Sequence, residues 1–329
     1  KYIKSIQRFF EKVNDDMSFV RIDVEDFYPT IDHEILLRTL RKKMRKPQLL
    51  HLVHSAIKTP TTSKTANEKG VPQGLSISNI LSSIYLGKID RRFAAKYAYF
   101  RYVDDILIIC PTETAVSVFN EIAVALKKIG LTSHKLGDNG KSQISPVSDG
   151  VDYLGFHITP TKVSVRKSSY SRMIENILSV FTRHKSEKSD DRFIWRLNLK
   201  ISGCIYRNKR FGWVFFFSQI NDIAQLARLD QFITDQLLKR GQPQLRPRIK
   251  TFVRSYHEIR FNLEQTQYVP NLDSYGIDRI IWVLSQEEGD PEEHYRANFT
   301  QEEIRSRFTR LMNFQTRLER DLIETVSYK

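Results

Sequence analysis

The sequence predicts an α/β fold in its first half, with an antiparallel sheet and helices on one face, and a helical second half. Apolar, β-branched runs at 19–24, 99–103 and 106–110 have the composition of strands. Residues 78–96 and 112–129 have the apolar spacing of helices, and Gly130 is a stop signal for the second. Later helical segments are interrupted by a Gly- and Pro-containing break at 241–247.

Two adjacent carboxylates, Asp104 and Asp105, separate two of the predicted strands. The short connection predicts a tight hairpin turn, and Asp tolerates the positive φ that such a turn can require. Neighbouring like charges raise each other's pKa unless a cation neutralises them. Mg²⁺ suits the position, because it binds one or two carboxylates together with substrate phosphates. Most Asp pairs in turns are only solvated, so the pair needs support from other residues.

A third carboxylate, Asp23, ends the predicted strand at 19–23. A helix is predicted to follow, with Asp32 as its N-cap and Glu34 in its first turn. If Asp23 lies beside the hairpin, the three carboxylates can hold two metal ions about 3.5–4 Å apart for an in-line phosphoryl displacement. The alternative is an edge strand with a solvated acidic end.

The segment 70–78 supplies a further signal. Gly70, Pro72 and Gly74 shape a loop around Gln73, and a loop of this kind approaches another group closely. Gln73 lies 50 residues after Asp23 and 31 residues before Asp104. An ordinary helix entry is the alternative for this loop taken alone.

In this series the segments resemble the palm motifs of reverse transcriptases. Residues 23–28 are similar to the first motif, 71–74 to the second, and 102–105 to the third. Gly130 and Leu131 with Lys141 and Ser142 are similar to the fourth motif, and residues 152–156 to the primer grip. The resemblance covers residues 15–160, and extends more loosely to about 240 through a segment similar to the helical thumb of retron-like and intron-like enzymes.

The resemblance implies a right-hand polymerase in three parts. These are a partial fingers and palm at 1–164, a helical thumb at 165–240 and a helical C-terminal extension at 241–329. Reverse transcriptases carry a larger fingers region before their first motif than the 22 residues that precede Asp23 here. We therefore expect that an N-terminal part is missing from this sequence.

The resemblance also implies the metal ligands. Asp23 and Asp104 would hold two Mg²⁺ ions, with Mn²⁺ as an alternative, while Asp105 assists and the Val24 carbonyl completes one coordination sphere. No protein nucleophile is required, because catalysis of this kind depends on positioning and on charge stabilisation.

A dNTP site is implied around the same carboxylates. Tyr28 would block a ribose 2′-hydroxyl, although a core aromatic is the alternative; Gln73 would contact the incoming nucleotide and Lys141 the pyrophosphate. Lys135 is an alternative to Lys141, because the spacing from Gly130 is longer than usual. The full predicted dNTP-binding set is Val24, Asp26, Phe27, Tyr28, Gln73 and Lys141, and Leu154 and Gly155 form the predicted primer grip.

The composition favours a polyanionic partner. The formal net charge is +14 and the sequence pI is about 9.6. No apolar run approaches the roughly 18 residues of a membrane span, and the two cysteines are predicted to be reduced thiols, so a cytoplasmic location is expected. Nucleic-acid contacts are predicted on one helix face at Arg38, Arg41, Lys42 and Arg45, for which a solvated face is the alternative. Further contacts are predicted in a second basic region, at Arg166 and Lys167.

The sequence therefore predicts an RNA-directed DNA polymerase. Its partners would be an RNA template, here a dedicated non-coding RNA, a DNA primer or product, and dNTPs. Residues 73–79 and 84–86 are most similar to bacterial defence-associated and abortive-infection enzymes, which suggests antiphage defence.

Two functional alternatives stay open. One is a group II intron-like maturase that acts mainly by RNA binding. The other is untemplated or protein-primed synthesis, with a tyrosine among Tyr256, Tyr268, Tyr275, Tyr295 and Tyr328 as primer. A long helix is predicted at 300–326, with Thr300 and Glu303 as a capping box at its start. Its apolar stripe is expected to pack on the thumb, or to form a partner or homo-oligomer contact; the stripe consists of Ile304, Phe308, Leu311, Phe314, Leu318 and Leu322.

Overall fold

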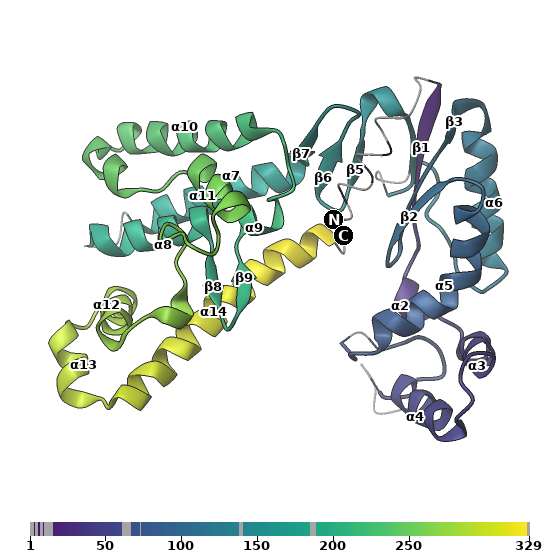
Figure 1. Ribbon diagram of the computed structural model, residues 1–329, viewed down its shortest axis with the longest axis horizontal. Helices are drawn as coiled ribbons and strands as arrows, with labels where there is room; N and C mark the ends of the chain where they lie inside the picture. The colour runs from purple at the N-terminus through teal and green to yellow at the C-terminus, as the bar shows by residue number, and fades with distance from the viewer. Residues whose placement is uncertain are drawn as a thin grey trace. The chain divides into compact units, whose positions relative to one another are not determined.

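The computed structural model describes residues 16–60, 67–72, 74–137, 141–184 and 189–327, together with Ile3, Ile6 and Phe9 (Figure 1). Internal contacts divide the chain into two compact units. The N-terminal unit comprises residues 1–151 and 159–161, and the C-terminal unit comprises residues 152–158 and 162–329. The three-part division predicted from the resemblance stays a prediction.

A four-stranded sheet forms the centre of the N-terminal unit. Its strands are β1 (Met17–Asp23), β2 (Ala98–Tyr102), β3 (Asp105–Pro111) and β4 (Gln143–Pro146), in the order β2-β3-β1-β4. Every pairing in this sheet is antiparallel. The predicted antiparallel sheet is therefore confirmed.

Helices precede and follow these strands. The predicted cap of α3 is confirmed, because the Asp32 side chain accepts the N–H of Ile35 at 2.9 Å. The helix expected from 112 begins instead as a short 3-10 turn, Thr112–Thr114, before α6. The α-helices of this unit are α2 (Phe27–Thr30), α3 (His33–Arg41), α4 (Pro47–Ile57), α5 (Ser78–Ala94) and α6 (Ala115–Lys127).

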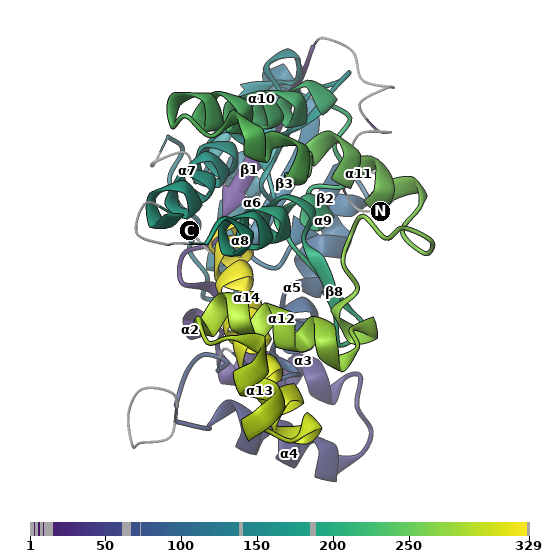
Figure 2. The same cartoon turned by 90° about the vertical axis from the view of Figure 1, so that its left-hand side faces the viewer.

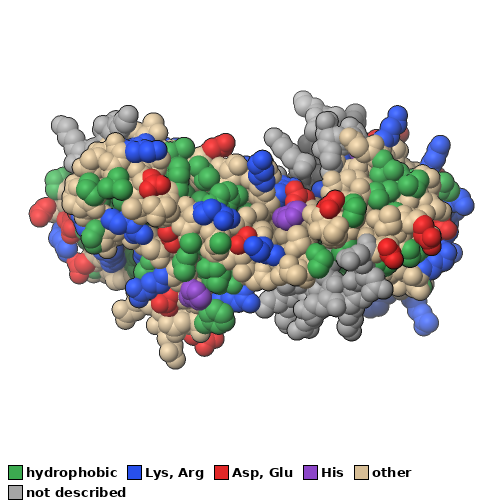
Figure 3. All heavy atoms as spheres, turned by 90° about the horizontal axis from the view of Figure 1, so that it is seen from above, with side chains coloured by type: hydrophobic (Ala, Val, Ile, Leu, Met, Phe, Trp, Pro, Cys, Tyr) green, Lys and Arg blue, Asp and Glu red, His purple; other side chains and the backbone are tan. Residues whose placement is uncertain are grey.

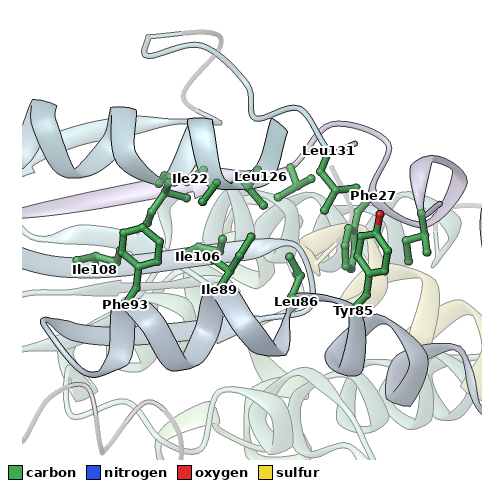
Figure 4. Packing of buried hydrophobic residues seen from close by; sticks show 14 of the residues in the cluster. Ile22, Phe27, Tyr85, Leu86, Ile89, Phe93, Ile106, Ile108, Leu126 and Leu131 are labelled. Atoms are coloured by element: carbon green, nitrogen blue, oxygen red, sulfur yellow. The ribbon is translucent and has the colours of Figure 1, made fainter. Parts of the chain in front are cut away.

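The two faces of this sheet differ. One face carries Ile22, Ile106 and Ile108, which pack against α5 and α6 in a continuous apolar core (Figure 4). Residues on adjacent strands that pair directly point to the same side of a sheet. Asp23, opposite Asp105, and Arg21, opposite Leu107, therefore share the other face. Burial of the apolar face thus fixes which residues the opposite face presents.

The C-terminal unit is mainly helical. A small sheet, in the order β5-β6-β7, lies at its start, and the chain passes from one unit to the other within β5. The strands are β5 (Val151–Tyr153), β6 (Phe156–Ile158) and β7 (Val163–Val165). The helices are α7 (Lys167–His184), α8 (Asp190–Ser202), α9 (Trp213–Phe216), α10 (Ile223–Lys239), α11 (Phe252–Phe261), α12 (Ile277–Glu288), α13 (Glu292–Asn298) and α14 (Gln301–Ser327).

A β-hairpin interrupts the helices that were expected between 165 and 240. It pairs β8 (Cys204–Tyr206) with β9 (Lys209–Phe211). Arg207 and Asn208 in its turn have positive φ, and the Asp273 carboxylate accepts both of their N–H groups, at 2.6 and 2.8 Å. A residue distant in sequence therefore stabilises this turn, which local pattern does not reveal.

The helix α14 follows the sequence prediction. Thr300 and Glu303 form the reciprocal bonds of a capping box at its start, with Thr300 N–H donating to Glu303 at 2.8 Å. Ile304, Phe308 and Met312 are buried in a cluster with α12, beside which α14 lies in Figure 2. The stripe was expected to pack on the thumb, but α14 packs mainly on α12 of the predicted C-terminal extension, with smaller contacts to α9 and β9. An oligomer contact stays a prediction.

Both cysteines, Cys110 and Cys204, are buried and free, as expected. In the described part of the chain, no helix combines the length and the apolar character needed to cross a membrane. Figure 3 shows Lys and Arg side chains distributed over one face among acidic and apolar ones. On that face the positive net charge does not by itself mark a single binding surface.

Candidate active site

The turn between β2 and β3 places Asp104 at the end of the sheet. Tyr102 pairs with Asp105, so the two turn residues are Val103 and Asp104. The sequence prediction of an Asp104–Asp105 turn was wrong by one residue, because Asp105 already belongs to β3. The positive φ, 56°, falls on Val103. This conformation is strained for a β-branched residue, and such strain is concentrated at functional sites.

The three predicted carboxylates meet at this end of the sheet. Asp23 lies directly opposite Asp105 in the ladder, and Asp104 immediately precedes Asp105. Asp105 accepts two bonds from the Arg21 guanidinium, each 3.0 Å long, and both side chains are mostly buried. Arg21 was not predicted as a site residue. A charged residue two positions before Asp23 in an apolar strand was the available signal.

The electrostatics of the site oppose full ionisation. Burial, together with the charges of Asp23 and Asp105, raises the pKa of Asp104 to about 6, although the charge of Arg21 opposes the shift. Burial also raises the pKa of Asp23, against the nearby charges of His134, Arg21 and Lys141. A divalent cation between Asp23 and Asp104 would favour both ionised forms.

His134 is a second residue of this site that the sequence did not reveal. Its Nε2 lies 3.5 Å from the Asp23 carboxylate and 3.2 Å from Lys141 Nζ, and its Nδ1 lies 3.6 Å from the Glu25 carboxylate. The backbone holds it there, because His134 N–H donates to the Asp23 carbonyl at 2.9 Å. The longer-than-usual spacing between Gly130 and Lys141 was the only sequence signal for this segment.

Of the two lysines considered for the site, Lys141 lies at it. Lys141 approaches His134, and its charge acts on Asp23. Ser142, beside it, accepts the N–H of Asp23 at 3.3 Å. Lys135 is exposed.

The donor set fits a magnesium ion that also binds its substrate. Asp23 and Asp104 supply carboxylates, and Mg²⁺ needs only one or two of these besides water and phosphate oxygens. Val24 lies opposite Ser133 in an isolated β-bridge. The backbone hydrogen bonds of this bridge join Asp23 to His134 and Glu25 to Thr132, so neither of them uses the Val24 carbonyl. No group of three or more His, Cys, Asp or Glu side chains is arranged to hold a metal within the described residues.

Tyr28 is fixed beside the carboxylates. Its side chain is 5% exposed, and its hydroxyl donates to Asn79 of α5. Burial raises the pKa of Tyr28, and the charge of Asp104 contributes in the same direction. The neighbouring Phe27 ring is 3% exposed in the core, so a nucleotide could reach only its backbone. Asp26, with φ of 40°, is exposed at the start of α2.

The loop before α5 is bound to α2. Val71 N–H donates to the Tyr28 carbonyl at 2.8 Å, and Gly70 N–H donates to the Ile31 carbonyl at 2.8 Å. Gly70 has φ of 86°, and a Cβ there would lie 2.8 Å from the Pro29 carbonyl oxygen. Glycine is required at this close approach. Gln73 lies outside the described residues.

The remaining predicted residues lie on α3 and the segment that follows it, and in the C-terminal unit. Arg38, Arg41 and Lys42 are exposed or half-buried on and after α3, but the helix ends at Arg41, so the prediction that Arg45 shares its face was wrong. Pro47, which starts α4, disfavours helical backbone at the residue before it and so limits the length of α3.

Leu154 and Gly155 form the positive-φ turn between β5 and β6. Arg166 N–H donates to the Gly155 carbonyl at 2.9 Å, and Lys167 begins α7. These last four residues belong to the C-terminal unit.

Comparison with protein families gives one match. Residues 3–158 match the family described as reverse transcriptase (RNA-dependent DNA polymerase). The resemblance inferred from the motifs is confirmed for this part of the chain.

Two curated proteins are similar. The COX1/OXI3 intron 2 protein of Saccharomyces cerevisiae is 26% identical over 83 residues, which are 24% of this chain and 10% of that protein. Protein YkfC of Escherichia coli is 23% identical over 222 residues, which are 55% of each chain. The chain thus spans a tenth of the first relative and about half of the second.

Solved telomerase structures are also similar. Apo telomerase from Candida tropicalis has a TM-score of 0.42 at 15% identity, with 99% of this chain and 56% of that chain covered. Telomerase from Candida albicans, in complex with a fragment of telomeric RNA, has a TM-score of 0.41 at 14% identity, with 90% and 50% covered.

Proposed function

We propose, from the premise that residues 3–158 form a reverse transcriptase domain, that this chain is an RNA-directed DNA polymerase whose active site is the acidic end of the β1–β3 sheet. The observation that carries the proposal is the meeting of Asp23, Asp104 and Asp105 at one end of the sheet, with raised pKa values at the first two. Such a site attracts divalent cations. We infer a right-hand polymerase architecture, with the four-stranded sheet as its palm.

Asp23, Asp104 and the Val24 carbonyl would hold the metal ions. When bound, the metal supplies charge stabilisation at the reacting phosphate and lowers the pKa of the attacking hydroxyl. Arg21 holds the Asp105 carboxylate in one orientation through its two bonds, and so positions the neighbouring Asp104 backbone. His134 holds Lys141 beside Asp23, where the ammonium can neutralise charge on the leaving pyrophosphate.

Tyr28 is proposed to select the sugar. The ring is held by the core on one side and by the bond from its hydroxyl to Asn79. A fixed ring beside Asp104 would leave no room for a 2′-hydroxyl, so dNTPs would be preferred to NTPs. Rotation of the ring would break the part-buried bond to Asn79 and the contacts of the ring with the core, which makes the barrier to a 2′-hydroxyl rigid.

The template, the primer and the biological role are further proposals. A dedicated non-coding RNA as template and a role in antiphage defence rest on the resemblance alone. Protein priming would need an accessible tyrosine hydroxyl, but Tyr256 and Tyr295 are 3% and 0% exposed. Tyr268 and Tyr275 are half-buried, and Tyr328 lies outside the described residues.

Sequencing of bound nucleic acid tests the proposal. The protein is purified with the nucleic acid that it carries, supplied with Mg²⁺ and dNTPs, and any RNA and new DNA are sequenced, with Asp104→Asn in parallel. DNA complementary to one bound RNA, made only by the unsubstituted protein, supports templated synthesis. Bound RNA without DNA synthesis favours a maturase-like role, and DNA without a matching RNA favours untemplated or protein-primed synthesis. Phage challenge of cells that express either protein tests the defence role.

A further inference from the structure

The C-terminal unit contains a series of cations in contact with aromatic rings, which we call the cation–aromatic track. It lies on the N-terminal end of α11, on the loop that follows α11, and on α12. The three cations are exposed or half-buried, and the three rings are half-buried. The track consists of Lys250, Arg254, Tyr268, Tyr275, Arg279 and Trp282.

One end of the track is built on Tyr268. The Arg254 guanidinium lies 4.4 Å from the centre of the Tyr268 ring, and Lys250 Nζ lies 5.3 Å from it. The Tyr268 hydroxyl accepts the N–H of Thr251, at 2.7 Å, which ties the loop to the start of α11. The ring is therefore held in place with two cations beside it.

The other end is built on Arg279. Its guanidinium lies 4.1 Å from the Trp282 ring and 5.9 Å from the Tyr275 ring. Trp195 of α8 supports both rings, at 5.9 Å from Trp282 and 6.5 Å from Tyr275. These aromatic contacts place Arg279 on a rigid platform.

The helix α8 joins the two ends. Trp195, Asn198 and Ser202 lie on one face of it, because they are three and seven positions apart. Asn198 accepts the Lys250 N–H at 2.7 Å, and Ser202 Oγ lies 3.3 Å from Lys250 Nζ. The same helix contacts both α11 and α12 (Figure 2). The track is thus one continuous surface with a common support.

Two of the three charges of the track lack a counter-ion. Arg254 lies 3.6 Å from Glu258, but neither Lys250 nor Arg279 forms an ion pair with any residue that the structure describes. Burial, together with the charge of Arg279, lowers the pKa of Lys250 to about 8. Two cations brought together in this way destabilise one another, and an anion between them would remove the cost.

A groove of about 410 Å³ opens beside the Tyr268 end. Glu258 lies in it, but bonds from Thr266 and Asn262 hold the pKa of this carboxyl below its usual range, and Arg254 Nε lies 3.6 Å away. Its negative charge is therefore balanced within the groove. The other lining residues are Gln265 and Gln267, with the Tyr268 ring. Amide side chains both donate and accept hydrogen bonds, as the edges of nucleobases require.

We propose that the cation–aromatic track binds single-stranded nucleic acid, with phosphates at Lys250 and Arg279, bases against the rings, and one base in the groove beside Tyr268. Alternating cations and aromatic faces are the elements with which proteins bind unpaired strands. A purely acidic peptide would use the cations but would leave the rings and the amide-lined groove without a role. The site is separate from the acidic sheet end and does not depend on the proposed polymerase activity.

Binding of labelled oligonucleotides to the full chain tests this site. Fluorescence anisotropy with oligouridylate and oligodeoxyuridylate of about 12 nucleotides, in EDTA, measures binding without nucleotide addition. The Arg254→Ala, Arg279→Ala double variant is expected to weaken binding to both strands at least about fivefold. The slope of log Kd against log salt should fall by about 0.7 for each phosphate that the variant no longer neutralises.

The matched control is Arg248→Ala, Arg296→Ala. Both cations are exposed in the same unit, but they are paired with Asp191 and Asp278. This variant carries the same change in net charge and should bind within about twofold of the unsubstituted protein. A third variant, Tyr268→Leu, should weaken binding while leaving the salt slope unchanged. The ratio of the two wild-type Kd values then tells which sugar the track prefers.

Photocrosslinking locates the bound strand directly. Oligouridylate that carries 5-iodouridine should crosslink to peptides that contain Tyr268 or Trp282, also in the Asp104→Asn variant. Equal weakening by both double variants, competition by polyglutamate as strong as by RNA, or crosslinks confined to residues 16–151 would each overturn the proposal. Failure of DNA synthesis alone would not, because no step of this test requires it.

Discussion

The acidic end of the sheet and the cation–aromatic track are opposite in charge but similar in construction. In the N-terminal unit, burial and like charge raise the pKa of Asp104 to about 6. In the C-terminal unit, burial and like charge lower the pKa of Lys250 to about 8. Each region holds like charges together on elements that are fixed by apolar packing. The same construction supports both proposals, in which a ligand of opposite charge completes each site: metal ions at the acidic end and phosphates at the track.

The largest expected effect lies at the acidic end. Asp104→Asn or Asp23→Asn should lower Mg²⁺-dependent DNA synthesis by about 10³-fold or more, because the variant lacks a metal ligand worth several kcal/mol of transition-state stabilisation. Steady-state primer extension measures this. Asp149→Asn, an exposed acid of the same unit, is the control and should keep its rate. Similar rates for Asp104→Asn and the control would contradict the proposal that Asp104 is a metal ligand.

The pH dependence of synthesis should follow Asp104. With a pKa of about 6, this carboxylate is protonated at lower pH, and a proton competes with the metal. At subsaturating Mg²⁺, the rate should fall about tenfold per pH unit below about pH 6. A higher Mg²⁺ concentration should shift this decline in rate to lower pH. If the decline does not shift with the Mg²⁺ concentration, a group other than Asp104 controls it.

Sugar selection should change less. Tyr28→Ala removes the ring beside Asp104 and should raise the incorporation of NTPs relative to dNTPs about tenfold. Tyr28→Phe removes only the bond to Asn79 and serves as the matched control. Competition between each dNTP and its NTP measures the ratio. If both variants discriminate as the unsubstituted protein does, Tyr28 is only a core residue.

The smallest effects are on stability, and their pH dependence distinguishes the two regions. The raised pKa of Asp104 destabilises the folded state above pH 6, and the penalty disappears as the pH falls toward 3.8. The lowered pKa of Lys250 destabilises the folded state below pH 8, and the penalty disappears as the pH rises toward 10.5.

Neutral variants test these two windows. At pH 7, Asp104→Asn and Lys250→Met should each stabilise the protein by about 1–2 kcal/mol, after allowance for solvent screening. The gain should fade in acid for the first variant and in alkali for the second. Thermal unfolding measured from pH 4 to pH 10.5 checks both. If the gain in stability does not vary with pH, the raised pKa of Asp104 and the lowered pKa of Lys250 are not its cause.

The sequence predicted those parts of the fold and site that depend on local pattern. The antiparallel sheet, the helix α5, the Asp32 cap and the capping box of Thr300 all follow from periodicity and end signals. The sequence left open whether Asp23 lies beside the hairpin or on an edge strand, and the pairing of Asp23 with Asp105 decides for the first.

The features that escaped prediction depend on contacts between distant residues. His134 reaches Asp23 through a bridge between segments more than 100 positions apart, and Asp273 fixes the hairpin turn at Arg207. The track likewise depends on α8, which joins Lys250 to Trp282 through side chains with no motif of their own. The position of the strained turn residue, Val103 rather than Asp104, was set by strand register, which local composition does not determine.

Extension of a DNA primer annealed to an RNA template, by the purified protein with Mg²⁺ and dNTPs, tests the central claim most directly. The acidic sheet end predicts template-dependent extension that stops when Mg²⁺ is chelated and that Asp104→Asn abolishes, while its fold is retained. Equal extension by Asp104→Asn and the unsubstituted protein would contradict the claim. So would the absence of extension by an unsubstituted protein that binds the primed template.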